Sequence, residues 1–306
     1  MSSTPRPESK VDAVLSGVSE TALLTLQVRA SEARRPDAII DDPMAVTLVD
    51  KIDYDFAKFG YARRQDMAIR ALAFDDATRT YLRDHPAATV VALAEGLQTS
   101  FWRLSAGGAG NPVEAGGAGN PVEAGGAGNP AEAHAGGKFR WLTVDLPPIV
   151  ELRNKLLPQS DRVEVAAQSA LDYGWMDRVD TSDGVFITAE GLLMYLQPTE
   201  AMALITECAK RFPGGAMMFD LPPSWFAWIA RRGMRTSTRY KVPPMPFSMS
   251  ASEAARLVDV VPGVRAVHDV PLPAGRGRVF NAALWAIQRI PLFDPVRPAF
   301  TLLEFG

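Results

Sequence analysis

Short apolar runs separated by segments of helical spacing form the main pattern of the chain from residue 89 onward. Such runs, rich in β-branched residues, are typical of strands buried on both faces of a parallel sheet. They lie at residues 89–93, 139–144, 162–167, 184–189 and 216–219. Residues 149–157 and 198–212 have helical spacing, and residues 264–272 and 299–305 are the expected last strands. The alternation predicts an α/β fold with a mostly parallel sheet and helices on both of its faces.

A helical region precedes the first strand. Apolar residues favour helices over residues 19–35, 41–49 and 63–83, and prolines separate the first two of these segments. We therefore divide the chain into an N-terminal helical cap or lid, residues 1–85, and a sheet-containing core, residues 86–306.

Residues 106–132 consist of three copies of a nonapeptide, AGGAGNPVE, AGGAGNPVE and AGGAGNPAE. The Gly-Gly and Asn-Pro pairs break helices and strands, and the repeat has too few apolar residues to form a core. It also lacks the aspartates of calcium-binding repeats, and we expect no metal site. We predict a disordered insertion in a surface loop, which a fold tolerates at little thermodynamic cost.

The turn after the first strand has features of a nucleotide-binding corner. Ala94, Glu95 and Gly96 follow the run TVVAL, and Leu97 and Phe101 continue into a helix whose unpaired N–H groups would face a ligand. The corner has one glycine instead of the three of a dinucleotide fingerprint, so an ordinary strand-to-helix connection also explains it.

Asp145, which ends the second strand, favours the nucleotide-binding interpretation. Without the 27 residues of the repeat, Gly96 and Asp145 are 22 positions apart, and the acidic residue that binds a ribose follows a glycine turn by about 20 positions. The Asp145 carboxylate could accept hydrogen bonds from both ribose hydroxyls. The alternative is that Asp145 begins a helix as its N-cap.

Aromatic residues and arginines are mixed in residues 222–247, after the fifth strand. Trp225, Phe226, Trp228 and Arg231 could clamp a planar or anionic substrate under a lid that this segment forms. The alternative is a surface helix whose aromatic residues pack on the sheet while its arginines stay in water.

Composition narrows the possible functions. The 306 residues are 47% hydrophobic and 22% charged with a net charge of −3, which argues against an obligate nucleic-acid binder. No apolar run has transmembrane length, and the first twenty residues lack the apolar block of a signal peptide. We expect a cytoplasmic protein without a membrane partner. The single Cys208 excludes an intramolecular disulfide, and the scattered histidines identify no catalytic base.

Four motifs resemble one family. They are VVALAEGLQTSFWRL, FRWLTVDLPP, GVFITAEGLLMYLQP and PGGAMMFDLP. They are similar to class I S-adenosylmethionine-dependent methyltransferases of the leucine carboxyl methyltransferase type, nearest to the O-methyltransferases of polyketide synthesis. The resemblance covers residues 19–305 except the repeat. It implies a Rossmann-like sheet of seven strands with the last strand antiparallel, and S-adenosylmethionine as cofactor.

The resemblance also implies roles for individual residues. Arg70 would pair with the cofactor carboxylate, Gly96 would face the methionine part, and Asp145 would bind the ribose. Leu171 and Asp172 would flank the adenine. The whole predicted cofactor site comprises Arg70, Ala94, Glu95, Gly96, Asp145, Leu146, Leu171, Asp172, Glu190 and Gly191.

The chain departs from the family pattern at two places. The family's corner usually reads Gly-Ala-Gly-Leu-Asp-Thr-Arg, whereas Ala94, Glu95, Gln98 and Ser100 replace four of these residues here. The family's Asp-Leu pair after the third strand becomes Ala170-Leu171, and Asp172 follows one place later.

We expect O-methyl transfer to a hydroxyl or carboxyl group of a small, hydrophobic, polyketide-like acceptor. Glu190 would lie beside the transferred methyl group, and Glu190 and Tyr195 are the candidates for a catalytic residue. Two alternatives remain at this point. One is a non-catalytic protein that keeps the fold as a cofactor-binding or interaction module, and the other is an NAD(P)-dependent oxidoreductase.

Overall fold

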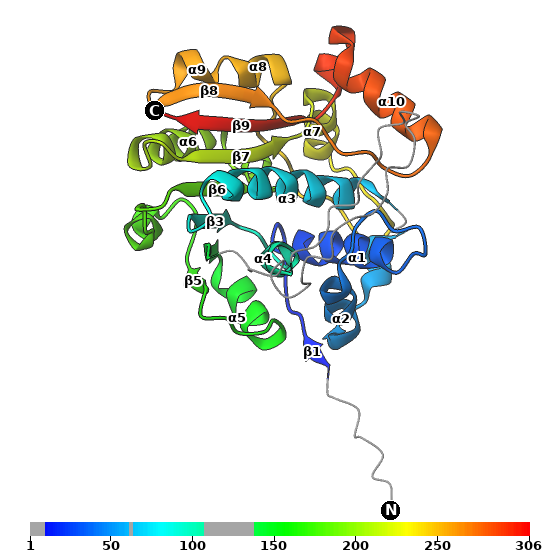
Figure 1. Cartoon of the computed structure of the whole chain (residues 1–306). Helices are drawn as coiled ribbons and strands as arrows, with labels where there is room; N and C mark the ends of the chain where they lie inside the picture. The colour runs from blue at the N-terminus through cyan, green and yellow to red at the C-terminus, as the bar shows by residue number, and fades with distance from the viewer. Residues whose placement is uncertain (1–9, 61–63, 107–137) are drawn as a thin grey trace, which may run out of the picture.

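A seven-stranded sheet forms the centre of the molecule (Figure 1). The computed structural model describes residues 10–60, 64–106 and 138–306. The sheet has the order β5-β4-β3-β6-β7-β9-β8. Its strands are β3 (Thr89–Leu93), β4 (Arg140–Asp145), β5 (Val163–Ala167), β6 (Val185–Ala189), β7 (Ala216–Leu221), β8 (Val264–Asp269) and β9 (Ala299–Phe305).

Pairing within the sheet is parallel except at β9, which runs antiparallel to both β7 and β8. The predicted Rossmann-like fold with an antiparallel last strand is therefore confirmed. The strand order reverses between β3 and β6, and parallel α/β sheets bind ligands at such a point, beyond the carboxyl ends of their strands.

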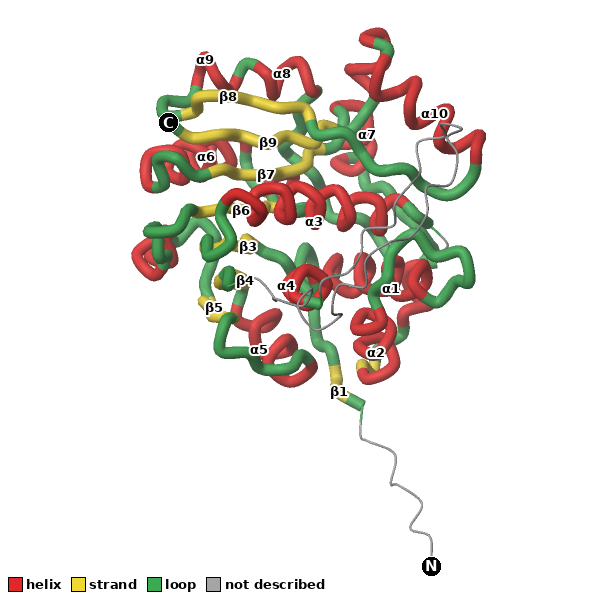
Figure 2. Tube along the Cα trace, viewed as in Figure 1, coloured by secondary structure: helices red, strands yellow, loops and turns green. Residues whose placement is uncertain are grey.

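Helices cover both faces of the sheet, as predicted (Figure 2). Side chains of β3 alternate between the faces, because successive residues of a strand point in opposite directions. Val90 and Ala92 join an apolar cluster that includes Phe74 of α3 (Asp66–Asp84). Val91 and Leu93 join a second cluster that includes residues of α5 (Pro147–Leu156) and α6 (Pro198–Arg211). Cys208 of α6 is fully buried there, and burial raises the pKa of its thiol.

The N-terminal region adds α1 (Thr21–Ala33) and α2 (Pro43–Lys51), which pack against each other. Pro43 is the first residue of α2, where the fixed φ angle of proline suits a helix. Asp42 is the N-cap of α2, and its carboxylate accepts a hydrogen bond from the Ala45 amide. Leu23 and Leu26 of α1 belong to the same apolar cluster as the sheet. The division of the chain at residue 85 remains a prediction.

Several short elements complete the chain. They are β1 (Val11–Asp12), β2 (Ile52–Asp53), α4 (Ser100–Ser105), α7 (Ser224–Arg231), α8 (Ala251–Ala255), α9 (Leu257–Val260) and α10 (Arg278–Arg289), with the 3-10 helices η1 (Phe56–Phe59), η2 (Tyr173–Arg178), η3 (Leu193–Tyr195) and η4 (Pro291–Val296). Helices α8, α9 and α10 were not predicted from the sequence.

The predicted nonapeptide insertion lies outside the described residues, apart from its first position, 106. Within the described part of the chain, none of the helices combines the length and the apolar character that crossing a bilayer requires. The cytoplasmic location remains a prediction.

Candidate active site

A cavity of about 670 Å³ lies beyond the carboxyl ends of the parallel strands, within the range of roughly 300–1,000 Å³ typical of small-molecule sites. Its lining comes from the turns after β3, β4, β5, β6 and β7, and from helices α1, α3, α7 and α10. The cavity brings together most of the predicted site residues, namely Arg70, Ala94, Glu95, Gly96, Asp145, Leu146, Leu171, Glu190, Gly191, Tyr195, Trp225 and Phe226.

The corner after β3 is a tight turn with two residues at positive φ. Ala94 has φ 50° and Gly96 has φ 61°. A Cβ atom on Gly96 would lie 2.8 Å from the Cβ of Ala22 in α1, so only glycine fits there without a shift of the backbone. Glycine at this position therefore lets α1 pack directly against the corner.

Asp145 at the end of β4 is bound to this corner. Its Oδ2 accepts a hydrogen bond of 2.8 Å from the Gly96 amide, and its Oδ1 accepts one of 2.8 Å from the Leu146 amide. The N-cap of α5 is Leu146, so Asp145 does not serve as the helix cap considered from the sequence. Burial raises the pKa of Asp145 to about 6, although the two amides and Arg153 act in the opposite direction. A carboxylate has about four acceptor sites, so Asp145 can still accept hydrogen bonds from a ligand.

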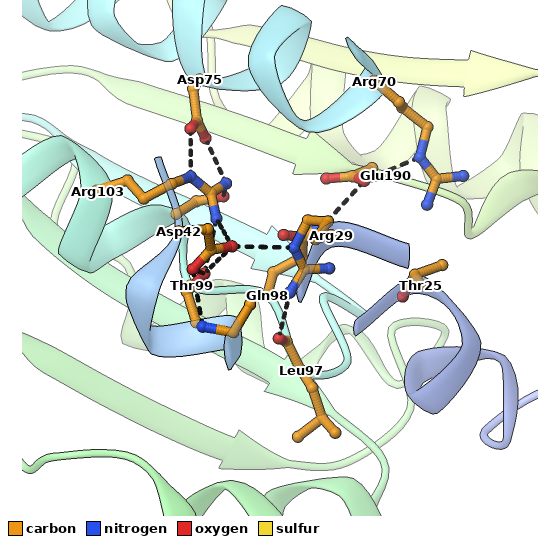
Figure 3. A network of polar contacts seen from close by, with 12 residues as sticks. Thr25, Arg29, Asp42, Arg70, Asp75, Leu97, Gln98, Thr99, Arg103 and Glu190 are labelled. Atoms are coloured by element: carbon orange, nitrogen blue, oxygen red, sulfur yellow. Dashed lines mark hydrogen bonds and ion pairs between the residues drawn. The ribbon is translucent and has the colours of Figure 1, made fainter. Parts of the chain in front are cut away.

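Arg70, on α3, lines the other side of the cavity. Its side chain points toward Glu190 (Figure 3). Its Nε donates to Glu190 Oε1 at 2.9 Å, and its Nη1 is 3.6 Å from Asp220 Oδ2. Gln98 Nε2 donates to the same Glu190 oxygen at 2.7 Å. Burial raises the pKa of Asp220, and the nearby Arg70 offsets part of this effect. Asp220 was not among the predicted site residues, although the sequence places it at the end of β7.

Gly191 brings the turn after β6 close to Arg70. Its φ is 67°, and a Cβ atom there would lie 3.2 Å from Arg70 Nη1. The Gly191 amide donates to Asp220 Oδ1 at 2.7 Å. The ends of β6 and β7 are thereby fixed to each other beside the guanidinium group.

Glu95 stabilises the turn after β3. Its carboxylate accepts hydrogen bonds from Trp141 Nε1 at 3.0 Å and from the Thr143 hydroxyl, and it pairs with Arg153 Nη2 at 2.9 Å. Arg153 also donates to the carbonyl oxygens of Gly96 at 2.6 Å and Gln98 at 3.2 Å. The main contacts of Glu95 therefore hold the turn in shape.

A buried charge network, which the sequence analysis missed, joins the corner to the N-terminal helices (Figure 3). Arg29 of α1 donates to Asp42 at 3.2 Å and to the Leu97 carbonyl at 2.7 Å. Asp42 also accepts from the Thr99 hydroxyl and from Arg103 at 2.9 Å. The network continues as Arg103 binds both oxygens of Asp75 on α3, at 2.7 and 3.0 Å. An arginine within an apolar helical pattern, such as Arg29, is the signal in the sequence that could have revealed it.

Three predicted site residues do not line the cavity. Asp172 is exposed and accepts a hydrogen bond from the Gly174 amide at the start of η2. Trp228 is 48% exposed and lies under Arg232, whose Cζ is 3.7 Å from the ring centroid. Arg231 donates to the Met245 carbonyl at 3.1 Å. Trp228 and Arg231 thus lie outside the lining of the cavity, and their part in a substrate clamp remains a prediction.

Comparisons of the sequence with known proteins assign the chain to a family. The chain is 30% identical over 254 residues, 82% of each chain, to a protein from Streptomyces glaucescens described as tetracenomycin polyketide synthesis O-methyltransferase. A model of the leucine carboxyl methyltransferase family matches residues 22–110. The chain belongs to this family. It is also 24% identical over 244 residues, 73% of this chain and 72% of the other, to an S-adenosyl-L-methionine-dependent methyltransferase from Gibberella zeae.

A solved structure from Thermobifida fusca, described as a putative methyltransferase, is similar at a TM-score of 0.49 and 14% identity, over 93% of this chain and 94% of that one. Family membership makes the chain an S-adenosylmethionine-dependent methyltransferase. It decides against both the oxidoreductase and the non-catalytic alternative.

The groups at the cavity fit S-adenosylmethionine. Arg70 supplies a cation for a carboxylate, and the buried Asp145 carboxylate suits hydroxyl donors, whose hydrogen bonds would stabilise its ionised form. Leu146, Ile149 and Leu171 supply the apolar surface that a purine needs. The site thus has a cationic part, an acceptor of hydrogen bonds and an apolar part in one continuous cavity.

Proposed function

We propose that the protein transfers the methyl group of S-adenosylmethionine to an oxygen of a small, apolar acceptor, and that this oxygen belongs to a carboxylate. One observation carries the choice of a carboxylate. Among the described residues that line the cavity there is no histidine and no lysine. A carboxylate is already ionised at neutral pH and needs no base, whereas an alcohol or a phenol needs one nearby.

Two carboxyl groups of the protein at the cavity already have hydrogen-bond and ion-pair partners. Glu190 accepts hydrogen bonds from Arg70 and Gln98, and Glu95 is bound to Trp141 and Arg153. Burial raises the pKa of the Tyr195 hydroxyl, so it does not supply a phenolate at neutral pH. These groups are suited to positioning reactants, and positioning is the main contribution an enzyme makes to an in-line displacement.

The bound cofactor supplies an electrophilic methyl group on a sulfonium. Arg70 would hold its carboxylate, Asp145 would accept hydrogen bonds from its ribose, and Leu146 and Leu171 would pack against its adenine. Glu190 and Gly191 would lie beside the reacting atoms. The apolar part of the cavity around Trp225 and Phe226 would exclude water and hold the acceptor. The description of the Streptomyces relative supports a polyketide-like acceptor.

A hydroxyl acceptor is the second candidate, and Asp220 favours it. Asp220 lines the cavity, and its raised pKa brings it closer to the range in which a carboxylate works as a general base. In that case Asp220 would take the proton of the acceptor hydroxyl.

The two candidates give chemically different products. We would incubate the protein with radiolabelled S-adenosylmethionine and aromatic acids or phenols of matched ring systems, and then treat the products with mild alkali. A labelled methyl ester is hydrolysed, whereas a methyl ether survives. Asp220→Asn should leave ester formation largely intact and abolish ether formation. Label on neither kind of product, with intact cofactor binding, would refute the proposed small-molecule activity.

A further inference from the structure

Helix α10 (Arg278–Arg289) differs from the other helices near the site because none of its residues is buried. Phe280, Leu284 and Ile287 nevertheless line the cavity. Their spacing of four and three residues places them on one stripe, which extends about 10 Å along the helix. The neighbouring Val279 and Trp285 are 86% and 61% exposed. The helix therefore has one apolar stripe directed to the cavity and two further apolar residues directed to solvent.

Polar contacts hold α10 in place. The Asn281 side chain bonds both the amide and the carbonyl of Gly275, at 2.8 and 2.9 Å, and Gln288 Oε1 accepts from the Leu272 amide at 3.0 Å. The same loop is joined to the N-terminal region through Arg276, whose amide donates to Gln65 Oε1 at 2.6 Å. Phe280, Leu284 and Ile287 belong to none of the apolar clusters of the described residues, so the stripe remains available to a ligand.

Gly275 fixes the first residue of the stripe. A Cβ atom there would lie 2.5 Å from Phe280 Cε1 and 2.8 Å from Ile69 Cδ1, so the Phe280 ring and the Ile69 side chain of α3 both pack directly against the loop backbone at Gly275. Leu284 is the middle residue of the stripe and Ile287 the last. A change of side-chain volume at Leu284 therefore acts on the centre of this wall.

We propose that Phe280, Leu284 and Ile287 form the wall of the acceptor subsite that sets the size of the apolar acceptor. This inference rests on the proposed function and assigns part of its specificity to α10. The residues proposed to hold the cofactor come from α3 and from the turns after β3, β4, β5 and β6. The α10 stripe shares the cavity with Trp225 and Phe226, whose rings meet edge to face at 5.7 Å.

The expected change in acceptor selectivity follows from how strongly apolar pockets discriminate between substrates of different size. One methylene group more or less in such a pocket changes the ratio of kcat/KM values by about 10- to 200-fold. Leu284→Trp adds much more volume than that and should exclude the largest acceptors. Leu284→Ala should shift the preference towards larger ones.

The test compares wild type, Leu284→Trp, Leu284→Ala and Ile287→Trp, with Trp285→Ala as the matched control on the outer side of the helix. A series of aromatic carboxylic acids with one to four fused rings serves as the panel, and kcat/KM is measured for each acid. Calorimetry gives the affinity for S-adenosylmethionine and, with S-adenosylhomocysteine bound, for each acid.

We expect Leu284→Trp to lower kcat/KM and binding of the largest accepted acid by at least about tenfold. Cofactor affinity should stay within about twofold, and Trp285→Ala should behave as wild type. Ile287→Trp should act in the same direction and covers the case in which Leu284→Trp fails to fold. A size profile that neither tryptophan variant changes, or an equal loss of cofactor affinity, would overturn the assignment.

If wild type methylates no member of the panel, the proposed acceptor class fails, and the binding measurements still decide the role of α10. Weaker binding of the largest acid to Leu284→Trp supports it, and equal or absent binding refutes it.

Discussion

Cofactor affinity should depend on the protonation of Asp145. Burial raises the pKa of this carboxyl to about 6, against the effects of the Gly96 and Leu146 amides. Only the ionised form can accept hydrogen bonds with all of its oxygen lone pairs, so a ribose should bind that form. If binding requires the carboxylate, the apparent Kd should rise about twofold at pH 6 and about elevenfold at pH 5, relative to its value at pH 8.

The stability of the protein without cofactor should change in the opposite direction. The folded-state pKa of Asp145 is raised from 3.8 to about 6, so the folded protein binds this proton more tightly than the unfolded chain. Stability from this group is therefore greatest at low pH and falls by at most about 3 kcal/mol as the pH rises from 4 through 6. Asp145→Asn should remove this dependence. The relevant quantity is the difference between the two proteins, because Asp220 also has a raised pKa.

Calorimetric titration with S-adenosylmethionine between pH 5 and pH 8, at constant ionic strength, measures the effect. Asp145→Asn should bind more weakly at neutral pH and show a nearly flat profile. Asp172→Asn, an exposed position outside the cavity, is the control and should keep the wild-type profile. A flat profile in wild type would refute the reasoning. A profile unchanged in Asp145→Asn would assign the titration to Asp220 instead.

Three further predictions concern stability, measured by urea denaturation. Arg70→Ala should lower the free energy of unfolding by about 3–5 kcal/mol, because it leaves two buried carboxylates without their cation. Arg79→Ala, in an exposed pair on the same helix, should lower it by no more than about 1 kcal/mol. Similar losses for both variants would contradict this prediction. Asp42→Ala should lower the free energy of unfolding by about 3–5 kcal/mol, because the buried Arg29 loses its ion-pair partner and Arg103 keeps only Asp75. Asp50→Ala, in an exposed pair, is its control. Tyr240→Phe should not lower the free energy of unfolding, because its buried hydroxyl has no hydrogen-bond partner in the described part of the chain; a loss above about 1 kcal/mol would reveal one.

Features set by local sequence could be predicted well. The run TVVAL gives β3 at Thr89–Leu93, because a strand buried on both faces needs no polar alternation. Asp145 and Glu190 could be placed at the cavity because residues at the carboxyl ends of parallel strands meet at one edge of the sheet. These inferences need only the direction of the chain and the order of the elements.

Features set by long-range packing could not be predicted. Trp228 lies one helical turn beyond Trp225 and so misses the cavity, although both have the spacing of one helix face. Glu95 stands at the corner, but its partners Trp141 and Arg153 come from β4 and α5. The stripe on α10 is visible as Phe280, Leu284 and Ile287, yet nothing local tells whether it faces a core, a cavity or solvent.

The departures from the family's corner motif change its charge and its backbone strain, and the chain still forms a tight turn there. Ala94 takes a φ of 50° where the family has glycine, which costs an L-residue roughly 1–2 kcal/mol. The buried arginines 29 and 153 bond three carbonyl oxygens of this turn and can offset that cost. Gln98, which replaces an aspartate, donates to Glu190, whereas an ionised carboxylate there could only accept hydrogen bonds and would repel Glu190. A degenerate motif was the reason to consider a protein without catalysis, and this turn gives no support to that idea.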